Sequence, residues 1–388
     1  MKRFLSLPRW FWFLSLFLAL DFLSRQVYLK IKDTRTSKEN QIVAEPVRPP
    51  EGKISPEDPQ LLGAAEDGTH PFYHHGLRAL RRTEGNWRGR TYAEFTNRLG
   101  FRDRKIRNVS LKKQHRRIIL IGDSNIYGVG LDWEQTLAGL LEKRFSGLEI
   151  LNAAVPSYCP TSEESKLRYL MGQHGLEADV VILFLDVADV DDELSYGRQA
   201  DGSTEFRAGQ FSELPGNKSW ADHLEKFLQE RIEKNLTLTG AFVRNVRQWV
   251  RRHVPWFGVM VYEKGRWPEY DGPLNSLIDE GILRAASSLT RLNEFLKSRN
   301  TSLILVVSPG SSQMDSLDPK SRALTIWEAW GQANDVPVLS LFPIFYEHAM
   351  EYPSLVQGSG HWNEKGHALV ADELSKQIPS KLLWANPP

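Results

Sequence analysis

The sequence predicts an α/β fold with a doubly wound, parallel five-stranded sheet. Short apolar runs rich in β-branched residues indicate strands buried on both faces, and longer stretches with helical periodicity separate them. Because strands and helices alternate, right-handed crossovers join neighbouring parallel strands, which gives a flavodoxin-like sheet. The expected strands are residues 117–121, 148–152, 179–185, 302–308 and 336–340.

Composition limits the classes of function. A chain of 388 residues allows one large domain with extensions, or two domains. A net charge of +1 gives no sign of the basic face that nucleic-acid binding needs, so no nucleic-acid partner is expected. The single cysteine, Cys159, excludes an internal disulfide framework and a thiolate-rich metal site. We expect no cofactor and no metal site.

The N-terminus contains an apolar run at residues 10–23, preceded by Lys2, Arg3 and Arg9. No small-residue cleavage site follows the run, which favours an uncleaved, single-pass membrane anchor within residues 1–30. Basic residues before the run place the following domain on the periplasmic or extracytoplasmic side. The alternative is an amphipathic or core helix of a soluble protein.

Three further segments follow the expected anchor. Residues 31–94 form a tether, rich in proline and charge, and a lead-in. Residues 95–380 form the α/β domain, and a helical insertion at about 190–285 separates its third and fourth strands. Tryptophans of the insertion either pack or stack on sugar rings, and its arginine cluster either is solvated or contacts an anionic polymer or lipid headgroups. These residues are Trp220, Trp249, Trp256 and Trp267, and Arg244, Arg247, Arg251 and Arg252.

The segment Gly122-Asp123-Ser124 ends the first strand and precedes a helical stretch. Open α/β sheets bind their ligands at the carboxyl ends of the strands, which is where Ser124 lies. A serine in such a sharp turn is either an exposed nucleophile or a structural residue that begins the helix.

Near the C-terminus, His361 lies in a glycine-bounded loop, and Asn363 is a plausible N-cap of the helix that follows. A histidine in this position can act as a general base on a nearby hydroxyl. A lone histidine is more often structural, but together with the Gly-Asp-Ser turn it becomes the expected partner of Ser124.

These segments resemble the sequence blocks of the SGNH/GDSL hydrolases, in the order that this family has. The resemblance covers roughly residues 95–376, and it implies the same fold that the strand pattern predicts. A lead-in at 96–103 is similar to that of envelope-associated bacterial members. The four blocks correspond to Gly122-Asp123-Ser124 with Gly128 and Gly130, to residues 150–158, to residues 179–189, and to residues 361–367.

The resemblance implies that Ser124 attacks an ester and His361 accepts its proton. It also implies oxyanion donors from the Ser124 N–H, a second-block backbone N–H and a third-block asparagine. The second-block residue is Ala154, which keeps its N–H, but the third-block residue is Ala188, which has no side-chain donor.

The remaining positions of the expected site also depart from the family pattern. Asp186 replaces a glycine and places a carboxylate near the oxyanion. Asn152 and Asp189 complete the expected oxyanion and substrate-binding set. The carboxylate that orients the histidine is absent, which leaves Ser359 as the candidate for that role.

Two hypotheses follow. The first is a membrane-anchored ester hydrolase or O-acyltransferase that acts in the cell envelope on an acylated glycan, or on a small ester, through Ser124 and His361. The second is a catalytically impaired relative that binds glycan or acts as a scaffold among partners of envelope polysaccharide assembly. The anchor and tether favour the first hypothesis, and the missing donor and carboxylate favour the second.

Overall fold

The structure is a computed structural model that describes residues 62–65, 67–207, 265–270, 275–357 and 360–378. The expected anchor, the tether before residue 62 and residues 208–264 of the expected helical insertion lie outside the described residues. In the part that is described, no helix combines the length and the apolarity that crossing a membrane requires. The membrane anchor therefore stays a prediction.

Five parallel strands form the centre of the sheet: β6 (Arg116–Ile121), β7 (Leu148–Asn152), β8 (Val180–Leu185), β11 (Ser302–Val307) and β12 (Val338–Ser340). Their order across the sheet is β12-β11-β8-β6-β7. Numbered along the chain, this order is 2-1-3-4-5 read from the β7 side, which is the flavodoxin-like order. The predicted fold class and all five strands are confirmed.

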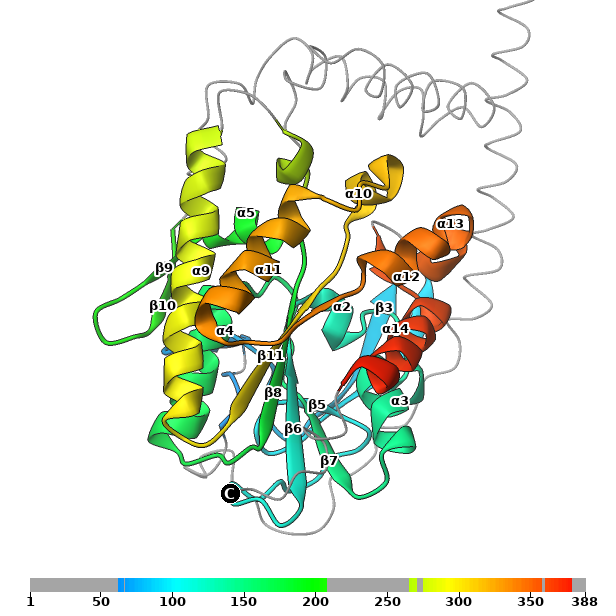
Figure 1. Ribbon diagram of the computed structural model, residues 1–388. Coiled ribbons are helices and arrows are strands. Elements are labelled where there is room, and N and C mark those ends of the chain that lie inside the picture. Colours follow the sequence, from blue (N-terminus) through cyan, green and yellow to red (C-terminus); the bar gives the residue numbers. More distant parts are fainter. Residues whose placement is uncertain (1–61, 66, 208–264, 271–274, 358–359, 379–388) are drawn as a thin grey trace, which may run out of the picture. The chain divides into compact units, whose positions relative to one another are not determined.

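Apolar side chains on both faces explain why these segments form central strands. Ile118 and Leu120 pack in one core cluster with α3 (Leu137–Arg144) and α14 (Glu364–Gln377). Ile119 and Ile121 are equally buried and point to the opposite face, because side chains alternate along a strand. In Figure 1, α3 and α14 lie together on one side of the sheet, with α4 (Pro160–Leu167), α9 (Asn275–Lys297) and α11 (Arg322–Asn334) on the other.

Three antiparallel strands extend the sheet beyond β7: β5 (Arg102–Asp103), β4 (Arg90–Thr96) and β3 (Arg82–Trp87). The sheet thus has eight strands, and the boundary expected between residues 94 and 95 falls inside β4. Arg88 and Gly89, which connect β3 and β4, both have positive φ, as a tight two-residue hairpin turn requires. The lead-in therefore belongs to the same sheet as the expected catalytic residues.

Shorter elements surround this sheet. Two-stranded hairpins form from β1 (Thr69–His70) with β2 (His74–His75), from β9 (Tyr196–Arg198) with β10 (Thr204–Phe206), and from β13 (Val356–Gln357) with β14 (His361–Trp362). The other described helices are α2 (Ser124–Tyr127), η1 (Trp133–Gln135), η2 (Arg168–Gln173), α5 (Asp189–Glu193), η4 (Trp267–Glu269), α10 (Ser311–Ser316), α12 (Phe342–Glu347), η5 (Ala349–Glu351) and α13 (Tyr352–Leu355).

One insertion tryptophan is resolved as a packing residue. Trp267 is fully buried, and its indole N–H donates a hydrogen bond to the Val187 carbonyl at 2.6 Å. This contact rules out Trp267 as an exposed platform for a sugar ring. The other three insertion tryptophans and the arginine cluster lie outside the described residues.

Candidate active site

Ser124 is the first residue of α2, the single helical turn that follows β6. Asp123 caps this turn, because its Oδ1 accepts a hydrogen bond from the Asn125 N–H at 2.9 Å. Gly122 leaves room for the turn, since a Cβ there would lie 2.9 Å from Cγ1 of Ile126. Gly128 ends the turn with a φ of 84°, a conformation that favours glycine. The Gly-Asp-Ser motif thus presents Ser124 at the carboxyl end of the strand.

His361 lies on β14, in the hairpin that precedes α14. Its Nε2 is 2.9 Å from Oγ of Ser124, although the two residues are far apart in the sequence. The structure therefore brings together the two residues that the sequence analysis paired. Their catalytic role stays a prediction.

The Ser124 hydroxyl also contacts Asp123. Its Oγ donates a hydrogen bond to Oδ2 of Asp123 at 3.0 Å. A hydroxyl has only one proton to donate, so Asp123 and His361 compete for it. When the proton points to Asp123, the imidazole must donate through Nε2–H, which is the tautomer opposite to the one a general base needs. Asp123 therefore competes directly with His361 for the serine proton.

The surroundings of His361 keep its imidazole neutral near pH 7. Burial lowers the pKa of His361 below its ordinary value of 6.5; the charge of Asp123 opposes this shift and that of Arg88 adds to it. A base must be unprotonated before it can accept a proton, so the lowered pKa suits His361 to this role.

Trp87 is a site residue that sequence reasoning missed. It ends β3, and its ring packs edge-on against the His361 ring with centroids 5.0 Å apart. The indole Nε1 is buried without a hydrogen-bond partner among the described residues. Trp87 belongs to no recognisable sequence motif. It comes close to His361 only because the hairpin of β3 and β4 places it there.

The backbone donor expected at Ala154 is already engaged. The Ala154 N–H donates to Oδ1 of Asn152 at 3.1 Å, and Nδ2 of Asn152 donates to the Ile126 carbonyl at 2.9 Å. Both residues are fully buried. Together, Ala154 and Asn152 join the loop after β7 to α2, and the roles expected of them at the oxyanion and the substrate stay predictions. Ser359, the candidate for orienting His361, lies outside the described residues.

Residues of the third block also form hydrogen bonds with one another. The Ala188 N–H donates to Oδ1 of Asp186 at 2.6 Å, and the Asp186 N–H donates to Oδ2 of Asp189 at 2.9 Å. Asp189 is only 1% exposed, and its expected role in substrate binding stays a prediction. Carboxylate oxygens of Asp123, Asp186 and Asp189 lie within 4.8 Å of one another, a convergence that the sequence analysis did not foresee.

Arg102, in the lead-in motif, forms hydrogen bonds to the loop that follows Ser124. Its Nη1 donates to the carbonyls of Tyr127 and Gly128, each at 2.6 Å, and its Nη2 donates to the Leu131 carbonyl. The guanidinium is 1% exposed and lies near the rings of Tyr92 and Tyr127. The resemblance in the lead-in thus corresponds to a physical support for the loop that follows Ser124.

Comparisons with known proteins place the fold among solved structures. No family model and no curated protein matches the chain. Similar solved structures include the psychrotrophic esterase EstA from Pseudoalteromonas sp., at 14% identity, TM-score 0.37, covering 69% of this chain and 100% of that one. A lipolytic G-D-S-L family member from Veillonella parvula matches at 11% identity, TM-score 0.36, over 68% and 98% of the two chains. A catalytic mutant of an acetylxylan esterase from Geobacillus stearothermophilus matches at 13% identity, TM-score 0.37, over 71% and 100%.

At such identities and TM-scores the matches carry no argument about activity. The strand order decides the fold. The fold is a doubly wound, flavodoxin-like α/β fold, which is the fold that the resemblance to the SGNH hydrolases implies. The four segments that carry the resemblance meet at one end of the parallel strands, because the loops after β6, β7 and β8 and the hairpin of His361 converge there.

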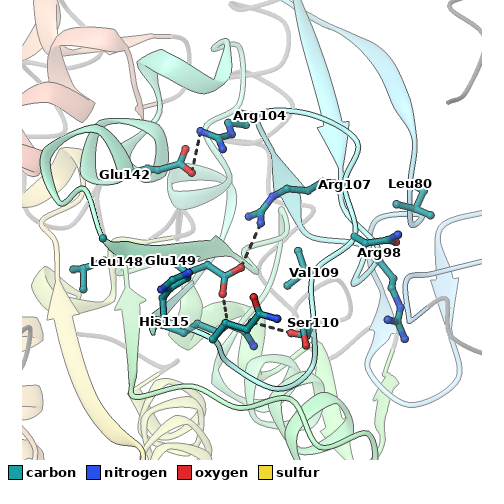
Figure 2. A pocket seen from close by; sticks show the side chains of 14 residues that line it. Leu80, Arg98, Arg104, Arg107, Val109, Ser110, His115, Glu142, Leu148 and Glu149 are labelled. Carbon is teal, nitrogen blue, oxygen red and sulfur yellow. Dashed lines mark hydrogen bonds and ion pairs between the residues drawn. The ribbon is translucent and has the colours of Figure 1, made fainter. Parts of the chain in front are cut away.

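A cavity of about 770 Å³ lies at the opposite end of the sheet, where β6 and β7 begin. Figure 2 shows Arg104 directed at Glu142 and Arg107 at Glu149 across this cavity, at 3.5 Å and 3.3 Å. Arg117 is also paired with Glu149, at 2.7 Å. Because these arginines are neutralised by carboxylates and lie far along the strands from Ser124, the cavity is not part of the candidate active site.

Proposed function

We propose that the chain hydrolyses or transfers ester-linked acyl groups through a Ser124–His361 pair. The observation that carries this proposal is the 2.9 Å contact between Oγ of Ser124 and Nε2 of His361. A hydroxyl and a neutral imidazole at this distance can exchange the proton that nucleophilic attack requires.

The nucleophile and the base that this reaction needs, Ser124 and His361, are both present in the site. Ser124 Oγ attacks the ester carbonyl carbon while its proton moves to Nε2 of His361. The tetrahedral adduct collapses, and the alcohol leaves with the proton that His361 returns to it. Water then attacks the acyl-serine by the same route, which releases the acid and restores the hydroxyl; an acceptor hydroxyl in place of water gives acyl transfer.

Stabilisation of the oxyanion is the weak part of this site. The Ser124 N–H has no partner within α2, because it belongs to the first helical residue. The Ala154 N–H is occupied by Asn152, and Ala188 offers no side-chain donor. Since removal of one oxyanion donor costs about 10²–10³ in turnover, we expect slow hydrolysis of unactivated esters.

The setting that we propose is the cell envelope. An apolar run at residues 10–23 and the charged, proline-rich segment that follows it support an N-terminal anchor with the catalytic domain on the periplasmic side. The resemblance to envelope-associated SGNH hydrolases supports an acylated glycan as the substrate. Partners in envelope polysaccharide assembly are part of the same proposal.

Covalent labelling tests the nucleophile directly. A fluorophosphonate probe should label the wild-type chain at Ser124, and labelling should be lost in Ser124→Ala and fall sharply in His361→Gln. Hydrolysis of an activated acetyl ester should follow the same order. Labelling of Ser124→Ala as strong as that of the wild type would overturn the proposal.

The second candidate function is glycan binding or scaffolding without catalysis. The engaged Ala154 N–H and the missing donor at Ala188 favour it. A wild-type chain that neither reacts with the probe nor hydrolyses the ester, but retains an acetylated polysaccharide on an affinity column, would establish this candidate instead.

A further inference from the structure

Lys166 is a buried lysine that the proposed mechanism does not yet use. It lies on α4 and is only 1% exposed, and its Nζ donates a hydrogen bond to the Ala153 carbonyl at 2.8 Å. Within the described part of the chain this carbonyl is its one hydrogen-bond acceptor, and no carboxylate forms an ion pair with it. Because a buried ammonium is costly, the groups around Nζ must favour its charge at this position.

Three aromatic rings surround the Lys166 ammonium. Nζ lies 5.5 Å from the ring centre of Tyr73, 5.1 Å from that of Phe101 and 5.1 Å from that of Tyr158. Aromatic faces attract a cation electrostatically. These rings, which we call the aromatic cage, come from the turn between β1 and β2, from the lead-in motif and from the loop after β7. The cage therefore holds a positive charge against the loop that follows β7.

The carbonyl that Lys166 contacts belongs to the same peptide unit as the Ala154 N–H. The resemblance to the SGNH hydrolases implies that this N–H is the second-block oxyanion donor. The described residues contain no cis peptide bond, so the C=O and the N–H of this planar unit point in opposite directions. An ammonium on the oxygen draws electron density from the N–H, which makes it a stronger donor on the other side.

The loop that carries this peptide is joined to the strand that leads to Ser124. The Ala153 N–H donates to the Leu120 carbonyl at 2.8 Å, and the Val155 N–H donates to the Gly122 carbonyl at 3.1 Å. Gly122 lies two residues before the serine. The backbone on each side of the Ala154 N–H is thus fixed to β6 and to the turn of the candidate nucleophile.

We propose that Lys166 is a positioning residue for the proposed ester chemistry: its ammonium holds the peptide between Ala153 and Ala154 and polarises the Ala154 N–H for bonding to the oxyanion. This inference rests on the proposed function. In the resting site the N–H donates to the neutral Oδ1 of Asn152 at 3.1 Å. An oxyanion is a charged acceptor, whose hydrogen bonds are roughly twice as strong, so the polarised N–H bonds it as the charge develops.

The charge of Lys166 is expected to titrate in the range of an activity assay. Burial lowers the pKa of Lys166 from 10.5 to about 7, and the charge of Glu163, three residues earlier on α4, opposes this shift. The ammonium is therefore present below about pH 7 and is lost above it. A neutral amine can still donate to the Ala153 carbonyl. A rise in pH thus removes the polarising charge and keeps the hydrogen bond.

The other titratable groups packed around the ammonium are two phenols, two imidazoles and the carboxyl group of Glu163. Burial raises the pKa of Tyr73 and of Tyr158 above its ordinary value, so both are neutral at pH 7. Burial lowers the pKa of His70 to about 4 and also lowers that of His75, and the charge of Lys166 contributes to both shifts. Burial raises the pKa of Glu163 well above its ordinary value.

The pH profile of turnover tests the role of the charge. We would measure kcat for an activated acetyl ester from about pH 5 to pH 9, corrected for background hydrolysis, in wild type and Lys166→Met. Methionine is unbranched like lysine, carries no charge and packs well against aromatic rings. The wild-type kcat should fall about ten-fold on an alkaline limb near pH 7, because a whole oxyanion donor is worth about 10²–10³.

Lys166→Met should lack this alkaline limb and keep the lower rate on both sides of pH 7. Its KM should stay within about three-fold of the wild type, because the oxyanion exists only in the transition state. A purely structural lysine would change stability but leave the limb in place. Burial also raises the pKa of Glu193 to about 7, so an alkaline limb that persists in Lys166→Met would belong to another group and overturn the proposal.

Lys143→Met is the matched control. Lys143 is an exposed lysine on α3, and its replacement should leave kcat and the alkaline limb as in the wild type. Thermal unfolding shows that each variant is folded at the assay temperature. If Lys166→Met does not fold, the wild-type profile decides, since a kcat that stays constant across pH 7 overturns the proposal.

A readout that needs no activity separates this inference from the proposed function. Selective ¹⁵N-alanine labelling reports the Ala154 amide, which Ala154→Gly identifies by the loss of its signal. Its proton shift should titrate with a midpoint near pH 7 in wild type and stay constant in Lys166→Met. A titrating amide in a chain that reacts with no ester would refute the esterase and leave the polarised peptide standing. Ester hydrolysis with neither a titrating amide nor an alkaline limb would refute the role of Lys166 and leave the esterase standing.

Discussion

Trp362 donates its backbone N–H to Oδ1 of Asn125 at 3.0 Å, so the residue after His361 is bonded to the residue after Ser124. This hydrogen bond joins the C-terminal hairpin to the serine turn at the point where the two expected catalytic side chains meet. The relative position of Ser124 and His361 is therefore fixed by their neighbours as well as by their own contact.

Replacing Asn125 should impair catalysis more than folding. Asn125→Ala removes the acceptor for the Trp362 N–H, and a small misplacement of His361 should lower turnover roughly ten- to hundred-fold. The measurement is kcat for an activated acetyl ester, with thermal unfolding as the control. An unchanged kcat would mean that the hairpin holds His361 without this bond.

Adding an oxyanion donor should raise activity. Ala188→Asn places a side-chain amide at the position where the resemblance implies one, and we expect at least about a ten-fold gain in acetyl-ester hydrolysis, since one donor is worth about 10²–10³. The double variant with Ser124→Ala is the control and should be inactive. If Ala188→Asn is no faster than the wild type, the missing donor does not limit the reaction.

The acid limb of the activity profile should lie below pH 6.5. Burial lowers the pKa of His361 from 6.5, and a protonated imidazole cannot accept the serine proton, so kcat/KM should fall as pH drops through the lowered pKa. Arg88→Gln removes a positive charge that contributes to this lowering, so its limb should move to higher pH by a few tenths, less at high salt. A wild-type limb above pH 6.5 would contradict the burial of His361.

Arg102 should be essential for stability. Arg102→Ala deprives three backbone carbonyls of their donor, each worth about 1–3 kcal/mol when buried, so the free energy of unfolding should fall by about 3 kcal/mol or more. Arg104→Ala, which breaks only a half-exposed ion pair, is the control and should stay within about 1 kcal/mol of the wild type. The measurement is urea unfolding; equal losses in the two variants would show that the buried guanidinium is dispensable.

His367 should make the fold sensitive to acid. Its Nδ1 accepts the Leu137 N–H at 3.0 Å, and burial lowers the pKa of His367 from 6.5 to about 3. The unfolded chain binds a proton below pH 6.5 that the folded chain refuses, so this stability is complete above pH 6.5. It should be lost at about 1.4 kcal/mol per pH unit as pH falls toward 3.

The variant His367→Gln tests that assignment. It should be less stable than the wild type at pH 7, but its free energy of unfolding should depend less on pH between 6.5 and 3. His115→Gln, at an exposed position, is the control and should follow the wild-type slope. A His367→Gln chain with the full wild-type slope would assign the acid sensitivity to other groups.

The central sheet could be predicted from the sequence because its strands are buried on both faces. Residues 118–121 are all apolar and buried, which favours a central strand, and the same is true of the apolar runs that form β8 and β11. The lead-in strands could be foreseen less well. β3 is short, charged and mostly exposed, and only its pairing with β4 makes it a strand.

The pairing of Ser124 with His361 could be predicted because each lies in a local motif with a recognisable shape. The bond between Ala154 and Asn152 could not, because it depends on backbone direction in a loop. The approach of Trp87 to His361 depends on how separate elements pack, and no sequence spacing encodes it.

Ser124 and His361 are 237 positions apart in the sequence, so the two residues of the site are synthesised at different times. At synthesis rates of about 5–20 residues per second, the serine leaves the ribosome roughly ten to fifty seconds before the histidine exists. Throughout that interval the Ser124 hydroxyl has Asp123 beside it but lacks the imidazole of His361. Under the proposed mechanism, a nascent chain cannot react with esters until the hairpin of His361 has docked against the serine turn.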